Sequence, residues 1–159
     1  AYNADISPVF IIAQAALESG WGKSTIGKYN VFGITRGGWS IDKCLLVTTH
    51  EYFRTKTVRF TAPEKVVKIE YVAGKGLYKY TCKRLFRNYA TLGEALRDHA
   101  AVLKKSWPEA WAYRMSPENY VKKIQEGRKK YATAPNYVET MVKMFGTVRK
   151  AMKEAGLSC

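Results

Sequence analysis

The segment that follows Ser7 constrains the fold most, because it combines an almost wholly apolar run with clear signals for where a helix begins and ends. Ser7 is a favourable N-cap, and Pro8 suits the first helical position. Gly20 can adopt the left-handed conformation that closes a helix C-terminus. We therefore predict a helix from about Pro8 to Ser19.

Glu18 places one carboxylate at the end of this helix. Between Val9 and Leu17 only Gln14 is polar, and a helix that is apolar all round belongs in a protein core. Partial burial disfavours the ionised form of Glu18, and the negative end of the helix dipole acts in the same direction, so we expect a raised pKa. A carboxyl group that stays protonated near neutral pH suits general acid catalysis. The alternative is a structural carboxylate that reaches solvent or pairs with Lys23.

The length and composition favour one globular domain, residues 1–159, large enough to bury a core without disulfides. No apolar run reaches the roughly 18 residues that a membrane helix needs, so we predict no membrane span. The chain begins without an initiator Met or a segment resembling a signal peptide, from which we expect a mature product or an excised domain.

The net charge of +14, from 27 basic and 13 acidic residues, predicts attraction to polyanions. Nucleic acid, anionic lipid and the anionic wall polymers of bacteria all satisfy this condition. The local basic clusters are typical of solvated faces, so charge alone does not select a function.

The cysteines and histidines give no metal-site spacing, and we predict no metal or cofactor. Cys44 and Cys82 can form a bridge if the protein is exported, or can be small buried thiols, whereas Cys159 is expected to be free and exposed. His50 and His99 have no paired spacing, and we expect His99 to be a structural residue on a helix.

The middle of the chain changes from helical to extended patterning, with β-branched and aromatic residues at a period of two. We predict an antiparallel sheet with strands near 45–53, 57–61, 66–72 and 77–86. Helices follow at about 91–105, from Ser116 onward and after Pro135. This order predicts an α+β fold in which a β-lobe, inserted at about 44–86, flanks a cleft.

Glu51, on the first predicted strand, is the best second carboxylate for cleavage of a glycosidic bond. A single Glu on an exposed strand is more often structural, so this assignment depends on family resemblance.

Five segments occur in an order that resembles bacterial N-acetylglucosaminidases of the flagellar muramidase and autolysin type, glycoside hydrolase family 73. They are Ala13-Gln-Ala-Ala-Leu-Glu-Ser-Gly-Trp-Gly-Lys-Ser24, Tyr29-Asn-Val-Phe-Gly-Ile34, Thr48-Thr-His-Glu-Tyr52, Phe86-Arg-Asn-Tyr89 and Tyr131-Ala-Thr-Ala-Pro-Asn-Tyr137. The resemblance covers nearly the whole chain, and the first and last segments are its most specific parts.

This resemblance implies a lysozyme-like fold, with a mainly helical lobe and a small sheet lobe, that cleaves the β-1,4 bond between N-acetylglucosamine and N-acetylmuramic acid. It implies Glu18 as general acid, Glu51 as the carboxylate that assists water, and Tyr131 as the tyrosine that orients the substrate. The acetamido group of the substrate is an alternative nucleophile.

The same resemblance implies a substrate groove that includes Trp21, Asn30, Phe32 and Tyr137. It also implies action outside the cytoplasm, or in phage lysis, on peptidoglycan glycan strands. We further expect a monomer, and we expect the positive charge to favour adhesion to anionic wall polymers. One departure is Ala134, where the family commonly has an Asp that would cap the next helix.

Three alternatives remain at this stage. A lytic transglycosylase would share the fold and the one glutamate but release anhydro sugars. A wall-binding module would keep the cleft without activity. A nucleic-acid-binding module would use the positive charge, but the segment Gly22-Lys23-Ser24 lacks the earlier glycine that a phosphate-binding loop needs, since that position is Leu17.

Overall fold

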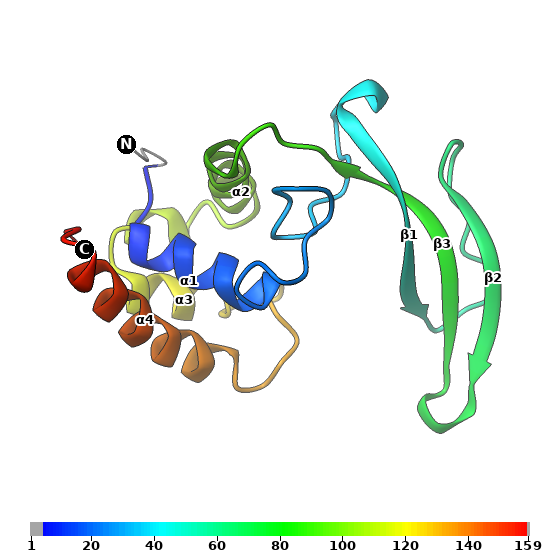
Figure 1. Cartoon of the computed structure of the whole chain (residues 1–159). Coiled ribbons are helices and arrows are strands. Elements are labelled where there is room, and N and C mark those ends of the chain that lie inside the picture. Colours follow the sequence, from blue (N-terminus) through cyan, green and yellow to red (C-terminus); the bar gives the residue numbers. More distant parts are fainter. Residues whose placement is uncertain (1–4, 159) are drawn as a thin grey trace.

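The computed structural model describes residues 5–158, which form a helical part and a sheet part at opposite ends of the molecule (Figure 1). The helical part contains α1 (Pro8–Ser19), α2 (Leu92–Ser106), α3 (Pro117–Lys123) and α4 (Tyr137–Glu154), with the 3-10 turn η3 (Ala110–Tyr113). The sheet part contains β1 (Cys44–Phe53), β2 (Lys65–Val72) and β3 (Leu77–Arg87), with the 3-10 turns η1 (Ile41–Lys43) and η2 (Ala73–Lys75). The predicted α+β architecture is confirmed.

Helix α1 begins and ends where the local sequence signals predicted. The Ser7 hydroxyl accepts a hydrogen bond from the backbone N–H of Phe10 at 3.4 Å. Gly20 has a φ of 56°, in the left-handed region, and its N–H bonds to the carbonyl of Leu17. These caps satisfy backbone groups that a helix end would otherwise leave unpaired.

The hydrophobic core lies around α1, which packs against residues of α2, α3 and α4. The ring of Phe10 meets Tyr120 of α3 edge-on, with ring centroids 4.8 Å apart, and lies 6.1 Å from Phe145 of α4. Because α1 is enclosed on several sides, its position is fixed as far as Glu18, which lies at the edge of the core.

The sheet has the order β1-β3-β2, with both pairs antiparallel. The predicted strand at 57–61 was wrong: this segment is a loop that packs against β3. The Tyr80 hydroxyl donates to the carbonyl of Thr55 at 2.8 Å and accepts from the N–H of Val58 at 3.3 Å. Since β1 and β2 already flank β3, its two edges offer no place for a further strand.

Cys44 and Cys82 are both free thiols. The register places Cys82 opposite Thr49, five residues from Cys44 along β1. That offset corresponds to about 16 Å along the strand, whereas a disulfide needs Cα atoms within about 7 Å. The bridge that the sequence left open is therefore absent from this structure, and Cys159 lies outside the described residues.

Within residues 5–158, no helix has the length and apolar character needed to cross a bilayer. The same residues contain no group of three or more histidine, cysteine or acidic side chains placed to hold a metal ion.

Candidate active site

A pocket of about 570 Å³ opens where the end of α1 meets the segment that leads into α4. Its lining residues are Leu17, Glu18, Tyr131, Ala132, Thr133, Ala134, Asn136, Tyr137 and Thr140. Among these lining residues Glu18 is the only carboxylate. The structure thus brings together three of the residues that the sequence selected, namely Glu18, Tyr131 and Tyr137.

Glu18 lies at the exposed end of α1, and the protein around its carboxyl group removes part of the surrounding solvent. Burial raises its pKa, and a hydrogen bond from the Tyr131 hydroxyl, which favours the ionised form, offsets part of that rise. The net direction is upward, as predicted from the sequence. Glu18 therefore holds its proton to a higher pH than an ordinary glutamate.

The hydroxyls of Tyr131 and Tyr137 remain protonated beside this acid. Burial raises the pKa of both groups, and the negative charge of Glu18 acts in the same direction. The ring centroids of the two tyrosines lie 5.5 Å apart, and the ring centroids of Trp107 and Tyr131 lie 5.6 Å apart. Both tyrosines are thus hydrogen-bond donors with ring positions fixed by packing.

Trp21 follows α1 in a sharp turn and leaves its ring largely in solvent, with 56% of the residue exposed. Its φ of 60° is unusual for a residue with a side chain. The turn is held by bonds from the Trp21 N–H to the carbonyl of Ala16, at 2.7 Å, and from the Gly22 N–H to the Ser19 hydroxyl, at 2.8 Å. An exposed aromatic plane is thereby presented next to the helix end that carries Glu18.

Phe32 lies against His99, with the two rings stacked at 3.7 Å and nearly parallel. One face of Phe32 is therefore already covered by protein. His99 itself is buried, which agrees with the structural role expected from the sequence.

Asn30 was predicted to contribute to the substrate groove, but the residue is buried, with only 1% of its surface exposed. Its amide nitrogen donates to the carbonyls of Ile34 and Arg87, and its oxygen accepts from the N–H of Ile34, each at 2.9 Å. A side chain used fully in this way fastens the loop after α1 to the end of β3.

Replacing Asn30 with Ala is expected to lower the free energy of unfolding by about 2–3 kcal/mol, because buried backbone groups lose their partners. Urea denaturation followed by circular dichroism would measure the change. Asn119→Ala, at an exposed position of α3, is the control and should change stability little. An unchanged midpoint for Asn30→Ala would contradict this role.

Glu51 does not line the Glu18 pocket. Both of its carboxylate oxygens accept from the guanidinium of Arg84, at 2.9 and 2.8 Å. Arg84 also bonds to Glu64 at 3.0 Å, and its guanidinium lies over the ring of Phe60. Hydrogen bonds from Arg84 and from the N–H of Leu85 lower the pKa of Glu64 despite its partial burial. This ionic cluster ties the loop before β2 to the sheet.

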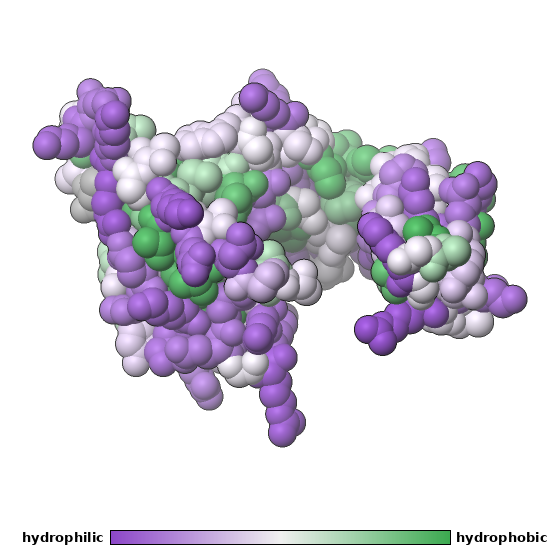
Figure 2. Space-filling model, turned by 90° about the horizontal axis from the view of Figure 1, so that it is seen from below, coloured by the Kyte–Doolittle hydropathy of each residue, from purple (hydrophilic) through white to green (hydrophobic). Residues whose placement is uncertain are grey.

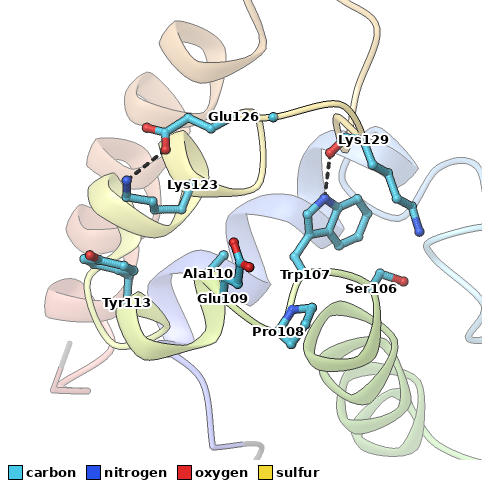
Figure 3. Close-up of a pocket in the computed structure, with 10 residues that line it drawn as sticks. Ser106, Trp107, Pro108, Glu109, Ala110, Tyr113, Lys123, Glu126 and Lys129 are labelled. Carbon is cyan, nitrogen blue, oxygen red and sulfur yellow. Dashed lines mark hydrogen bonds and ion pairs between the residues drawn. The ribbon is translucent and has the colours of Figure 1, made fainter.

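A wide hollow separates the helical part from the sheet part in the space-filling view (Figure 2). A second pocket, of about 610 Å³, lies between the end of α2, η3 and the segment after α3 (Figure 3). There the Trp107 indole N–H donates to the carbonyl of Lys129 at 2.9 Å, and Lys123 pairs with Glu126 at 2.8 Å. None of the predicted site residues lines this pocket, so the candidate active site is the Glu18 pocket.

Sequence reasoning missed two sets of partners. Arg84 and Glu64, which tie the loop before β2 to the sheet, had no motif to mark them. Gln14 gave one signal, because it is the single polar residue in an apolar stretch, and a buried polar side chain needs partners.

Residues 1–150 match the model of the family described as mannosyl-glycoprotein endo-beta-N-acetylglucosaminidase, the family predicted from the motifs. The chain is 31% identical over 150 residues to the peptidoglycan hydrolase FlgJ of Salmonella typhimurium, covering 91% of this chain and 40% of that protein. It is 31% identical over 140 residues to a probable N-acetylmuramidase of Lactococcus lactis, covering 82% of this chain and 26% of that protein. It is 30% identical over 142 residues to an autolysin of Enterococcus faecalis, covering 84% of this chain and 16% of that protein. The chain thus spans less than half the length of these relatives.

Solved structures agree with this match. A C-terminally truncated glycoside hydrolase domain of Salmonella typhimurium FlgJ superposes with a TM-score of 0.57 at 27% identity, covering 94% of this chain and 87% of that one. A peptidoglycan hydrolase from Sphingomonas sp. A1 gives a TM-score of 0.59 at 24% identity, covering 98% of this chain and 86% of that one. The predicted lysozyme-like fold is confirmed.

Proposed function

We propose that this chain, which belongs to the mannosyl-glycoprotein endo-beta-N-acetylglucosaminidase family, is a peptidoglycan hydrolase that works outside the cytoplasm. The bond cleaved is the β-1,4 linkage between N-acetylglucosamine and N-acetylmuramic acid. One observation carries the proposal: a carboxyl group with a raised pKa lies in an open pocket against a tyrosine hydroxyl. The names of the relatives support the substrate class.

The reaction begins with Glu18 as general acid. Its proton passes to the glycosidic oxygen as the bond to the sugar breaks, and the carboxylate that remains accepts the hydrogen bond from Tyr131. This bond gains strength as the charge develops, so it stabilises the transition state more than the ground state. The exposed ring of Trp21 offers a platform for the apolar face of a sugar.

The reaction does not need Glu51 as a nucleophile or base. Glu18 is the only carboxylate lining the pocket, and Glu51 is bound by Arg84 in the sheet. We therefore assign the nucleophile to the acetamido oxygen of the substrate, which attacks the anomeric carbon as the leaving oxygen takes the Glu18 proton. This attack closes a five-membered ring between the acetamido group and the anomeric carbon. Water then attacks the anomeric carbon, breaks the new bond and gives a proton back to Glu18. Such substrate assistance is an established exception to the two-carboxylate mechanism.

The same single-carboxylate pocket also suits a lytic transglycosylase, in which a sugar hydroxyl replaces water. Mass spectrometry of fragments released from purified peptidoglycan separates the candidates. Reducing N-acetylglucosamine ends support the proposed bond. Reducing N-acetylmuramic acid ends would indicate a muramidase, anhydro-muramyl ends a transglycosylase, and binding without release a wall-binding module.

Glu51→Gln is expected to reduce the rate of fragment release less than about 5-fold, since the amide keeps one hydrogen bond to Arg84 and takes no part in the chemistry. The same change should lower the thermal midpoint, because Arg84 loses half of its counter-charge. Rates and midpoints of the wild type and Glu51→Gln would be measured together. A rate loss above about 100-fold with an unchanged midpoint would restore Glu51 as a catalytic group.

The net charge of +14 supports a second interaction, with anionic polymers of the cell wall. We propose that the chain acts as a monomer on glycan strands held near such polymers. Adhesion to walls should then weaken as salt increases, because exposed charges are screened.

A further inference from the structure

Three buried polar side chains form a hydrogen-bonded row beneath the Glu18 pocket. His99 of α2 is 4% exposed, Gln14 of α1 is 0% exposed and Tyr137 of α4 is 5% exposed. The His99 Nε2 and the Gln14 Oε1 lie 2.7 Å apart, and the Gln14 Nε2 lies 2.9 Å from the Tyr137 hydroxyl oxygen. The row links three helices and ends at a residue that lines the pocket.

The direction of the hydrogen bonds follows from the nitrogen at the far end of the row. The Nδ1 of His99 is buried and has no hydrogen-bond partner among residues 5–158. A proton on this nitrogen would be a buried donor without an acceptor, which is rarer and costlier than a bare lone pair. The proton therefore resides on Nε2, and His99 donates to Gln14.

This arrangement fixes the remaining two groups in turn. Because the Gln14 oxygen accepts from His99, its NH₂ group faces Tyr137 and donates to the hydroxyl oxygen. The hydroxyl cannot return its own proton to an NH₂ group. The structure shows no hydrogen bond donated by this hydroxyl to another described residue, so its proton is free to point toward the pocket that Tyr137 lines, where it lies within the electrostatic influence of Glu18.

We propose that His99 and Gln14 are positioning residues whose one-way row of hydrogen bonds turns the Tyr137 hydroxyl into a donor aimed at the substrate. Its target is an oxygen of the sugar bound beside Glu18, such as the acetamido carbonyl. The inference rests on the proposed function for its substrate, but the row itself is a property of the fold.

Two further features keep the row in this state. Burial lowers the pKa of His99 to about 3, so the ring stays neutral at any ordinary working pH and Nδ1 stays bare. The Phe32 ring stacked on His99 prevents rotation of the imidazole plane. Gln14 precedes Glu18 by one helical turn, so the same helix positions the acid and the row.

The first test is the tautomer of His99, read from nitrogen-proton NMR correlations of the imidazole in the wild type. We expect a neutral ring with the proton on Nε2 between pH 5 and pH 8. A proton on Nδ1, or a charged ring, would reverse or break the row and overturn the proposal. This result does not depend on activity, so it remains decisive even if the wild type releases no fragments.

The second test is a double-mutant cycle on the rate of fragment release. Tyr137→Phe and Gln14→Met should each lower kcat/KM by up to about 10-fold, the effect of one hydrogen bond. The double variant should be no slower than Tyr137→Phe, because Gln14 acts only through that hydroxyl. Additive losses, or a Gln14→Met variant that loses stability and no activity, would contradict the proposal.

Tyr120→Phe is the matched control for the loss of a buried tyrosine hydroxyl. Tyr120 packs against α1, and its hydroxyl has no hydrogen-bond partner within residues 5–158. This variant should keep the wild-type rate. Thermal unfolding of every variant identifies any that fail to fold, and the NMR result on the wild type stands without them.

Discussion

Glu18→Gln is expected to lower the rate of peptidoglycan cleavage by about 10²- to 10⁴-fold, the contribution typical of a general acid. The amide has the shape of the carboxylic acid but has no acidic proton to give to the leaving oxygen. Tyr131 can still donate to the amide oxygen, so the pocket should keep its form. Loss of activity in a folded protein would therefore report the proton transfer itself.

The stability of this variant provides an independent check on the raised pKa. A group whose pKa is higher in the folded than in the unfolded protein costs stability once the pH rises above its ordinary value, 4.5 for Glu18. Glu18→Gln removes that cost. Its thermal midpoint should match the wild type below pH 4.5 and exceed it progressively as the pH rises through the folded pKa.

Turbidity loss of purified peptidoglycan and mass spectrometry of its fragments would measure the activity. Glu139→Gln, an exposed glutamate in the first turn of α4, is the matched control and should keep the wild-type rate. If Glu18→Gln retained more than about a tenth of the activity, Glu18 would not be the acid, since general acid catalysis supplies at least about 100-fold.

The parts of the fold that sequence predicted well depend on neighbours along the chain. Helix α1 is an example, because the cap at Ser7 and the left-handed Gly20 act within one or two turns. The raised pKa of Glu18 followed from the same local pattern. These signals need no knowledge of the rest of the molecule.

The errors arose where the outcome depends on distant partners. The segment 57–61 has strand-like composition, but β3 already pairs on both edges, and the N–H of Val58 in this segment bonds to the Tyr80 hydroxyl instead. Asn30 has the same sequence signature whether it faces a groove or fastens a loop. The pairing of Gln14 with His99 joins residues 85 positions apart, and only the isolated polar position in α1 indicated it.

Tyr131→Phe is expected to lower the maximal rate by about 10- to 100-fold, because the carboxylate formed on Glu18 loses a hydrogen bond to a charged group worth about 1.5–3 kcal/mol. The ring keeps its packing against Trp107 and Tyr137, so the fold should be retained.

The pH dependence distinguishes this effect from a general loss of binding. The Tyr131 hydroxyl lowers the pKa of Glu18, so its removal raises that pKa further. Activity needs protonated Glu18 and is lost as the pH rises through its pKa. The alkaline limb of the kcat/KM profile should therefore move to higher pH in Tyr131→Phe, while Tyr113→Phe, in the other pocket, leaves it in place. A limb that moved to lower pH, or a normal rate with an unmoved limb, would show that Tyr131 does not act on the acid.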